Sequence, residues 1–300
     1  MIEFGANLQG KGKVSVVSVC SHAHLDVWKL TSALLREYVY ADEYLVYVPE
    51  EYMRIFRRST PDYVTVESER KLGQSFGPTL ARAVEDAGNG DRFGWYFQQF
   101  LKIQALLASD SEQLIIWDAD CVPVRPQELF SSDGKPVYGR AFEYHEPYFD
   151  NIQRLMGMKR VQDQSFVIPG FPIFREWVHE WSDFVRTRLG TRSWFDAIQV
   201  TTDFKLRAGF SEFETLGTWI ANTHIGEWAS RDIRWERLGQ SRFGYARNLS
   251  PGELLKLGNQ EDLDVISFEN WDGRGLRRAM KRLRNRAPSL PRLNSMLPEY

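Results

Sequence analysis

Short hydrophobic strand-like runs alternate with segments of helical periodicity in the N-terminal part of the chain. Runs at 14–20, 44–48 and 63–67 predict strands, because their β-branched and aromatic residues favour an extended, half-buried backbone. Apolar residues spaced three and four apart predict helices at 27–38 and 50–58. This alternation predicts the opening half of a Rossmann-like nucleotide-binding fold of the α/β class.

The helix predicted at 93–107 carries two lines of residues of different character. Its aromatic and aliphatic stripe predicts the buried face. Gln98 and Lys102 stand four residues apart and therefore share a second line on the helix surface. Because a buried strand with two carboxylates follows directly, we expect this line to face the anionic part of a ligand. A solvated polar face is the alternative.

That strand is predicted at 113–117, and Asp118-Ala119-Asp120 follows it. Its consecutive apolar residues indicate burial on both faces of a parallel sheet. Ligands bind outside the carboxyl ends of such strands, and side chains two residues apart share one side of an extended segment. Asp118 and Asp120 can therefore face one cation, and their oxygen ligands suit Mn²⁺ or Mg²⁺. A solvated turn is the simpler alternative.

The loop after the first strand carries two histidines and a carboxylate, between Ser21 and Asp26. In a doubly wound sheet this loop lies at the ligand crevice, so His24 and Asp26 are candidates for contacts with a nucleobase or ribose. A solvated surface loop is the alternative. The chain has no Gly-x-Gly-x-x-Gly or Walker sequence, which argues against a dinucleotide enzyme and a P-loop NTPase.

The C-terminal half is predicted to contain further strands and helices. Hydrophobic runs predict strands at 137–139 and 165–168, and the irregular aromatic stretch at 142–149 between them is a candidate acceptor loop. Apolar residues at helical spacing predict a core-facing helix at 174–189.

Two acidic residues open the helix predicted to begin after Ser211. Ser211 and Glu214 have the spacing of a capping box, which explains both residues without chemistry. Glu212 lacks that explanation, and a carboxylate at a helix N-terminus stays ionised, which suits a general base or a ligand for an acceptor hydroxyl. His224 is a candidate third metal ligand, with a purely structural histidine as the alternative.

The composition is that of an ordinary globular chain and narrows the function only slightly. With 300 residues the chain forms one large α/β domain or two small ones, and a net charge of −2 gives no general attraction to nucleic acid. Its aromatic content of 14% suits core packing and also stacking on sugar rings. Two cysteines without ligand spacing, no long apolar run and no signal region predict a cytoplasmic protein.

Two enzyme classes use an Asp-x-Asp sequence after a strand. Phosphatases of the haloacid dehalogenase type carry a nucleophilic and an acid–base aspartate there, and glycosyltransferases of the GT-A type use the pair to hold a divalent ion on the diphosphate of a nucleotide sugar. The phosphatase sequence normally follows the first strand, whereas here about a hundred residues of α/β pattern precede the pair. The position therefore favours the glycosyltransferase.

Three segments together resemble a family of bacterial GT-A-like glycosyltransferases, many of them related to polysaccharide biosynthesis. They are Gly94-Trp95-Tyr96-Phe97-Gln98-Gln99-Phe100-Leu101-Lys102, Trp117-Asp118-Ala119-Asp120 and Phe210-Ser211-Glu212-Phe213-Glu214. The similarity runs from about 14 to 222, and the family's Tyr-Gly pair after the third segment is replaced here by Thr-Leu-Gly. The resemblance implies a GT-A-like fold, in which a Rossmann-like mixed sheet is flanked by helices, together with a nucleotide-sugar donor and a saccharide or lipid-linked acceptor.

These expectations divide the chain into two regions. Residues 1–272 are predicted to form the glycosyltransferase domain, with a nucleotide-sugar-binding half at 14–124 and an acceptor half at 125–272. Residues 273–300 are predicted to form a helical, basic extension. Its segment 274–292 has eight basic residues and no acid beside an apolar stripe, which predicts peripheral contact with the anionic inner face of a membrane. A non-catalytic nucleotide-sugar-binding protein is a further alternative.

Overall fold

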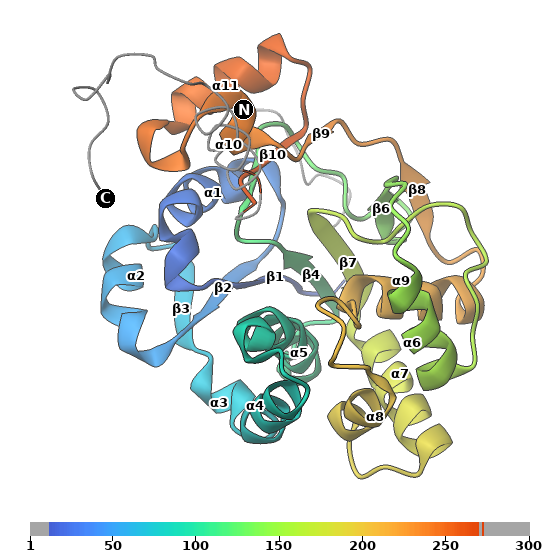
Figure 1. Cartoon of the computed structure of the whole chain (residues 1–300). Helices are drawn as coiled ribbons and strands as arrows, with labels where there is room; N and C mark the ends of the chain where they lie inside the picture. The colour runs from blue at the N-terminus through green and yellow to red at the C-terminus, as the bar shows by residue number, and fades with distance from the viewer. Residues whose placement is uncertain (1–11, 270–271, 273–300) are drawn as a thin grey trace, which may run out of the picture.

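In the computed structural model, which describes residues 12–269 and 272, a five-stranded sheet forms the centre of the fold (Figure 1). In spatial order the strands are β3 (Val64–Ser68), β2 (Glu43–Val48), β1 (Val14–Val19), β4 (Gln113–Trp117) and β7 (Gly170–Phe174). The first four are parallel, and β7 is antiparallel to β4. The chain is therefore a mixed α/β protein with a mixed sheet, as predicted.

Helices cover both faces of this sheet, which explains why β1 and β4 are buried throughout. The helices on one face are α1 (Leu25–Tyr38) and α2 (Met53–Ser59). Those on the other are α3 (Arg70–Gly73), α4 (Gly77–Asp86), α5 (Phe93–Ala108), α7 (Arg175–Leu189), α8 (Trp194–Thr201) and α9 (Glu212–Thr223). Successive side chains of β4 alternate between the two cores: Ile115 packs toward α1, and Ile116 packs toward α5.

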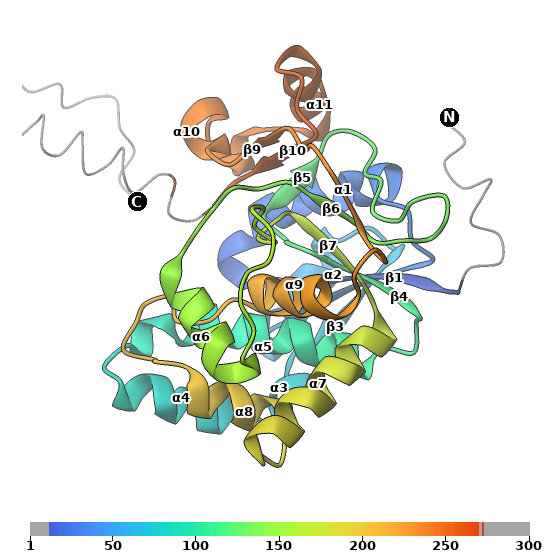
Figure 2. The same cartoon turned by 90° about the vertical axis from the view of Figure 1, so that its right-hand side faces the viewer.

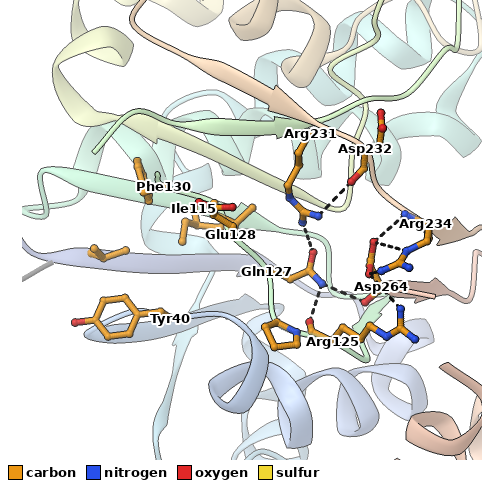
Figure 3. A pocket seen from close by; sticks show the side chains of 13 residues that line it. Tyr40, Ile115, Arg125, Gln127, Glu128, Phe130, Arg231, Asp232, Arg234 and Asp264 are labelled. Atoms are coloured by element: carbon orange, nitrogen blue, oxygen red, sulfur yellow. Dashed lines mark hydrogen bonds and ion pairs between the residues drawn. The ribbon is translucent and has the colours of Figure 1, made fainter. Parts of the chain in front are cut away.

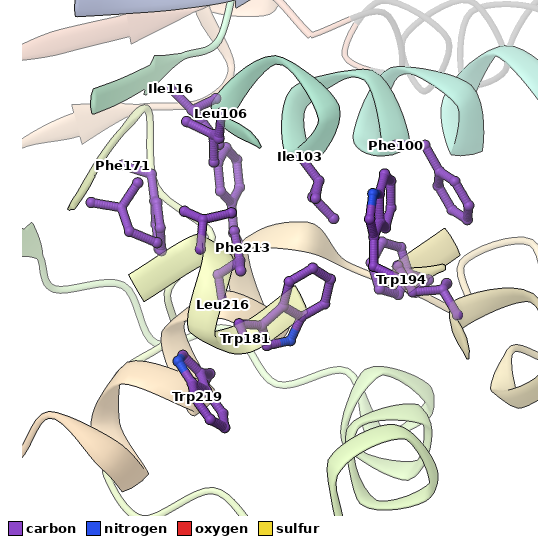
Figure 4. Close-up of a cluster of buried hydrophobic side chains, with 14 of the residues drawn as sticks. Phe100, Ile103, Leu106, Ile116, Phe171, Trp181, Trp194, Phe213, Leu216 and Trp219 are labelled. Carbon is purple, nitrogen blue, oxygen red and sulfur yellow. The ribbon is translucent and has the colours of Figure 1, made fainter. Parts of the chain in front are cut away.

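The core on the α5 face is rich in aromatic residues. Figure 4 shows side chains of α5 opposite those of α7, α8 and α9, including Phe100, Trp181, Trp194 and Phe213. Phe100 and Trp181 are fully buried, and the rings of Phe100 and Trp194 lie 5.5 Å apart. This packing fixes the N-terminus of α9 against α5, which positions one side of the candidate site.

The strand order creates a switch point between β1 and β4. From β1 the chain moves outward to β2 and β3, and it then returns through α5 to β4 on the other side of β1. The hydroxyl of Ser18 donates to the carbonyl of Trp117 at 2.8 Å and joins the carboxyl ends of these two strands. In open α/β sheets ligands bind outside the strands at such a point.

The remaining strands form two small sheets. β5 (Cys121–Pro123), β10 (Val265–Ser267) and β9 (Trp235–Glu236) form one, and β6 (Val137–Gly139) and β8 (Ala229–Arg231) form the other. The helices beside these sheets are α10 (Gly239–Phe243) and α11 (Pro251–Gln260), whereas α6 (Glu146–Met156) packs on α7, α8 and α9 in the core on the α5 face. Figure 2 shows α10 and α11 beside β9 and β10 at one end of the molecule, with α4, α7 and α8 at the other. Because β10 pairs with β5, the end of the described chain lies beside the segment that follows β4.

Two sequence predictions in this region are wrong. The segment 165–168 is buried but forms only a bridge between Ser165 and Ala141, and the strand begins at Gly170 instead. A Cβ at Gly170 would lie 2.7 Å from the Trp117 ring, so the close approach of β7 to β4 requires glycine there. The stretch at 142–149 is irregular only at its start, because α6 begins at Glu146.

The predicted basic extension, 273–300, and its segment 274–292 lie outside the described residues. Among the residues that the structure does describe, none of the helices has the length and apolar character needed to span a membrane.

Candidate active site

The two aspartates that follow β4 occupy a tight turn between β4 and β5. The Cys121 amide donates to the Asp118 carbonyl at 3.1 Å, and the Asp118 amide donates to the carbonyl of Pro169 at 3.1 Å. The Asp120 carbonyl accepts from the Phe268 amide at 2.9 Å, next to β10. One hydrogen bond within the turn and two bonds to other segments therefore fix this turn, and its side chains stand at the switch point of the sheet.

Asp118, Asp120 and Cys121 form a group of possible metal ligands, with their ligand atoms within 4.8 Å of one another. The Cys121 thiol lies 2.9 Å from the Ser267 hydroxyl, and burial, followed by the two aspartates, raises the pKa of this thiol. A neutral thiol is a poor ligand, because metals bind the thiolate. The two carboxylates remain, and they fit a hard cation such as Mg²⁺ or Mn²⁺ whose other positions are filled by substrate oxygens.

The negative charge of Asp120 is less well compensated than that of Asp118. Burial raises its pKa to about 7, and repulsion from Asp118 and Glu269 adds to that rise. Glu269 itself accepts from the Arg237 guanidinium at 2.8 Å. Repulsion among carboxylates is relieved by a bound cation, so this part of the site favours positive charge.

Lys102 of α5 connects Asp118 with Glu212. Its Nζ lies 2.6 Å from Asp118 Oδ1 and 2.7 Å from Glu212 Oε1, and it stands 4.5 Å from the centre of the Phe213 ring. Burial would lower the pKa of Lys102, but the two carboxylates outweigh that effect and raise it. The ammonium group therefore stays charged at neutral pH and holds one oxygen of Asp118 in place. The sequence predicts Lys102 at the site but in contact with the ligand, whereas in the structure Lys102 contacts Asp118 and Glu212.

Gln99, rather than Gln98, contacts the ion-paired residues Lys102, Asp118 and Glu212 through Glu212. The Gln99 side-chain oxygen accepts from the Glu212 amide at 3.2 Å, and its nitrogen donates to the Trp95 carbonyl at 3.2 Å. Gln98 lies half-buried one position away on α5. Sequence reasoning missed Gln99, although it stands three residues before Lys102 and so shares its face of the helix.

Glu212 and Glu214 are both buried at the start of α9. Burial raises the pKa of Glu212, and Lys102 opposes that rise. The Ser211 hydroxyl accepts from the Glu214 amide at 3.3 Å, which is half of the predicted capping box. The other half is wrong, because the Glu214 carboxylate accepts from the Ser165 hydroxyl instead. Glu214 thus joins α9 to the segment before β7.

The loop after β1 brings one of its two predicted residues to the site. His24 ends a short 3₁₀ turn and lies half-buried; burial lowers its pKa, and the charge of Asp118 opposes that change. His24 therefore lies within electrostatic range of Asp118. Asp26 is exposed and pairs with Lys29 at 3.1 Å, one turn further along α1.

His224 does not join the aspartates. It caps the C-terminus of α9, whereas Glu212 begins that helix, and a helix of 12 residues is roughly 18 Å long. Its ring stacks on Trp177 at 4.1 Å, and its Nε2 lies 3.1 Å from Glu180. The predicted third metal ligand is thus a packed histidine between α9 and α7, outside the ligand group that the described residues form.

No known protein-family model matches the chain, and none of the curated proteins shows significant similarity to it. The fold and the site thus stand on their own geometry. The cluster of Asp118, Asp120 and Cys121 is a group defined by distance, and by itself it identifies no enzyme class.

Proposed function

We propose that the chain is a metal-dependent glycosyltransferase with a GT-A-like fold, which transfers a sugar from a nucleotide-sugar donor to a hydroxyl of a saccharide or lipid-linked acceptor. One observation carries this proposal: Asp118 and Asp120 follow β4 directly, beside β1, where the strand order reverses. A nucleotide lying across the carboxyl ends of these strands would place its diphosphate at the carboxylate pair.

Within this proposal Asp118 and Asp120 hold Mn²⁺ or Mg²⁺. The ion would supply positive charge to the departing diphosphate. Lys102 fixes the orientation of Asp118 through the contact of 2.6 Å, and it leaves the second oxygen of Asp118 to the cation. His24 follows β1 at the same end of the sheet and is the residue proposed to contact the nucleoside.

Glu212 remains the proposed acceptor-side carboxylate. Its pKa is raised by burial, which is the direction that suits a group accepting a proton near neutral pH. Its contact of 2.7 Å with Lys102 also ties it to Asp118, so the donor and acceptor sides share one ammonium group. A substrate that displaces Lys102 from Glu212 would make this carboxylate available as a base.

The experiment is a screen of nucleotide sugars with and without Mn²⁺, in which release of nucleoside diphosphate is measured. The wild-type protein should release it only with the metal, and Asp120→Asn should abolish release while keeping the fold. Asp183→Asn is the matched control, because Asp183 is exposed on α7 and pairs with Arg186 on the same helix, at 3.0 Å.

Three results would contradict the proposal in different ways. Unchanged Mn²⁺-dependent release by Asp120→Asn would remove the aspartate pair from the mechanism. Release of inorganic phosphate from phosphate monoesters would indicate a phosphatase of the haloacid dehalogenase type. Metal-dependent donor binding without any turnover, with all acceptors tested, would indicate a non-catalytic nucleotide-sugar-binding protein.

A further inference from the structure

Figure 3 shows a separate pocket of about 870 Å³. It lies on the α1 face of the central sheet, whereas Lys102 belongs to α5 on the other face. It is formed by the first residue of β1, Val14, by the segment 125–130 that follows β5, and by residues around β8 and β10. None of its lining residues belongs to the candidate active site. Its volume is in the range of small-molecule pockets, about 300–1,000 Å³.

The two ends of this pocket differ in character. Figure 3 shows Tyr40, Phe130 and Ile115 on one side, and it shows Arg231 and Arg234 on the other. Tyr40 is 42% exposed although it is a large aromatic residue, so its ring is available at the rim. The pocket therefore offers an apolar end and a polar end to one ligand.

Two of the three arginines in the lining are neutralised by aspartates. Arg234 donates to Asp264 at 2.8 Å and to Asp262 at 2.6 Å. Arg125 donates to the other oxygen of Asp262, also at 2.6 Å. These four residues form a closed cluster of two positive and two negative charges, so they leave little attraction for a ligand.

Arg231 differs from those two arginines. Its Nη2 donates to the Gln127 side chain at 2.6 Å and its Nη1 to the Asp232 carbonyl at 3.4 Å, and both acceptors are neutral. Its Nε is buried and has no acceptor among the described residues. The Asp232 carboxylate is directed elsewhere, because it pairs with Arg140 at 2.9 Å and its side chain is 87% exposed.

This arrangement leaves a largely buried guanidinium without a direct carboxylate partner in the described part of the chain. Burial lowers the pKa of Arg231, and the more distant charges of Asp264 and Glu128 oppose that change without forming an ion pair. A buried cation normally has a paired anion, since removing it from water is costly. An anion in the pocket would supply the missing partner.

We propose that this pocket binds a small amphipathic anion, with its carboxylate or phosphate group on Arg231 and its apolar body between Tyr40 and Phe130. Among the described residues the Nη groups of Arg231 donate to neutral acceptors, and guanidinium groups bind both kinds of anion through parallel hydrogen bonds. The apolar end adds affinity by removing the ligand's hydrocarbon surface from water.

The first test uses the full wild-type chain and three probes of similar shape: 3-phenylpropionate, phenyl phosphate and the neutral 3-phenylpropanamide. Affinities are measured by titration calorimetry at low salt. At least one of the two anions should bind more tightly than the amide, by a factor of about ten or more. A charge-assisted hydrogen bond is expected to contribute an affinity gain of this size. The stronger anion identifies the chemistry of the acidic group.

The second test uses Arg231→Gln, which keeps a hydrogen-bond donor but removes the charge. This variant should lose about tenfold or more in affinity for the better anion and bind the amide as before. Arg186→Gln is the control, because it removes an equal charge from the exposed surface of α7. Anions that bind the wild type no better than the amide would overturn the proposal, even if Arg231→Gln does not fold. An unchanged anion affinity in a folded Arg231→Gln protein would overturn it as well.

Discussion

Replacing Lys102 with methionine tests the chain of ion pairs at the centre of the candidate active site. The Nζ of Lys102 contacts Asp118 and Glu212 at 2.6 and 2.7 Å, and the side chains of Lys102 and Glu212 are 6% and 5% exposed. Methionine keeps the apolar contacts of the lysine stem and removes the charge together with the hydrogen bonds that the ammonium group donates. Because Glu212 would remain buried without a cation, we expect the free energy of unfolding to fall by about 3–5 kcal/mol. Asp118 contributes less to this loss of stability, because its side chain is 26% exposed and water can hydrate its charge.

The loss should depend on pH with a defined sign. Burial already raises the pKa of Glu212, and Lys102 opposes that rise, so the variant should have a still higher pKa in the folded state. Between the unfolded pKa of about 4.3 and the folded pKa, the native protein holds a proton that the unfolded chain has released. The stability of Lys102→Met should therefore be greatest near the lower limit of this window and decrease as the pH rises, by up to about 1.4 kcal/mol per pH unit.

The measurement is urea-induced unfolding of wild type and variants between about pH 5 and about pH 8. The double variant Lys102→Met/Glu212→Gln should recover most of the loss, because it leaves no buried charge at Glu212. Lys29→Met is the matched control: its partner Asp26 lies 3.1 Å away, but both side chains are about half exposed, and the change should cost less than about 1 kcal/mol. A loss below about 1 kcal/mol in Lys102→Met, or a double variant as unstable as the single one, would refute this reasoning.

Three further predictions follow from individual residues. Burial raises the pKa of Asp120 to about 7, so the metal-free protein should lose stability as the pH rises from about 4 to about 7, and Asp120→Asn should remove that part of the slope in the same urea assay. Gly217→Ala should lower the free energy of unfolding by about 1–3 kcal/mol or more, because the added Cβ would overlap the Phe166 ring; an unchanged melting temperature would contradict this packing. Cys20 and Cys121 are 1% and 2% exposed and burial raises the pKa of both thiols, so a thiol reagent at pH 8 should label them only after unfolding, and rapid labelling of the native protein would disprove their burial.

Much of the central sheet could be predicted because its signals are local. β-branched runs and helical spacing depend only on neighbouring residues, and the structure has β1, β2, β3 and β4 within one residue of the predicted strands. The carboxylates of Asp118 and Asp120 could be placed for the same reason, since the end of a buried strand can be seen in the sequence. The predicted mixed sheet flanked by helices is confirmed at this level.

The errors concern features that depend on distant contacts. The run at 165–168 is as hydrophobic as a strand, but the fit of Gly170 against Trp117 decides that the pairing begins later. The sequence offers His224 either as a metal ligand or as a structural histidine, and its contacts with Trp177 and Glu180, which decide for the second, come from the packing of α9 on α7. No local pattern reports such contacts.

The pairing of Lys102 with Glu212 joins residues 110 positions apart and was likewise not predictable from spacing. The position of Lys102 explains why the neighbouring carboxylates of Asp118 and Asp120 have different electrostatic environments. Asp118 has an ammonium group at 2.6 Å, whereas Asp120 is half-buried, faces the charges of Asp118 and Glu269, and has a pKa raised to about 7. Lys102 thus compensates the charge of Asp118, whereas the charge of Asp120 is repelled by its neighbouring carboxylates. A cation bound at the turn would gain most of its electrostatic stabilisation from Asp120, and the position of Asp118 would be fixed by α5 and α9 before the cation arrives.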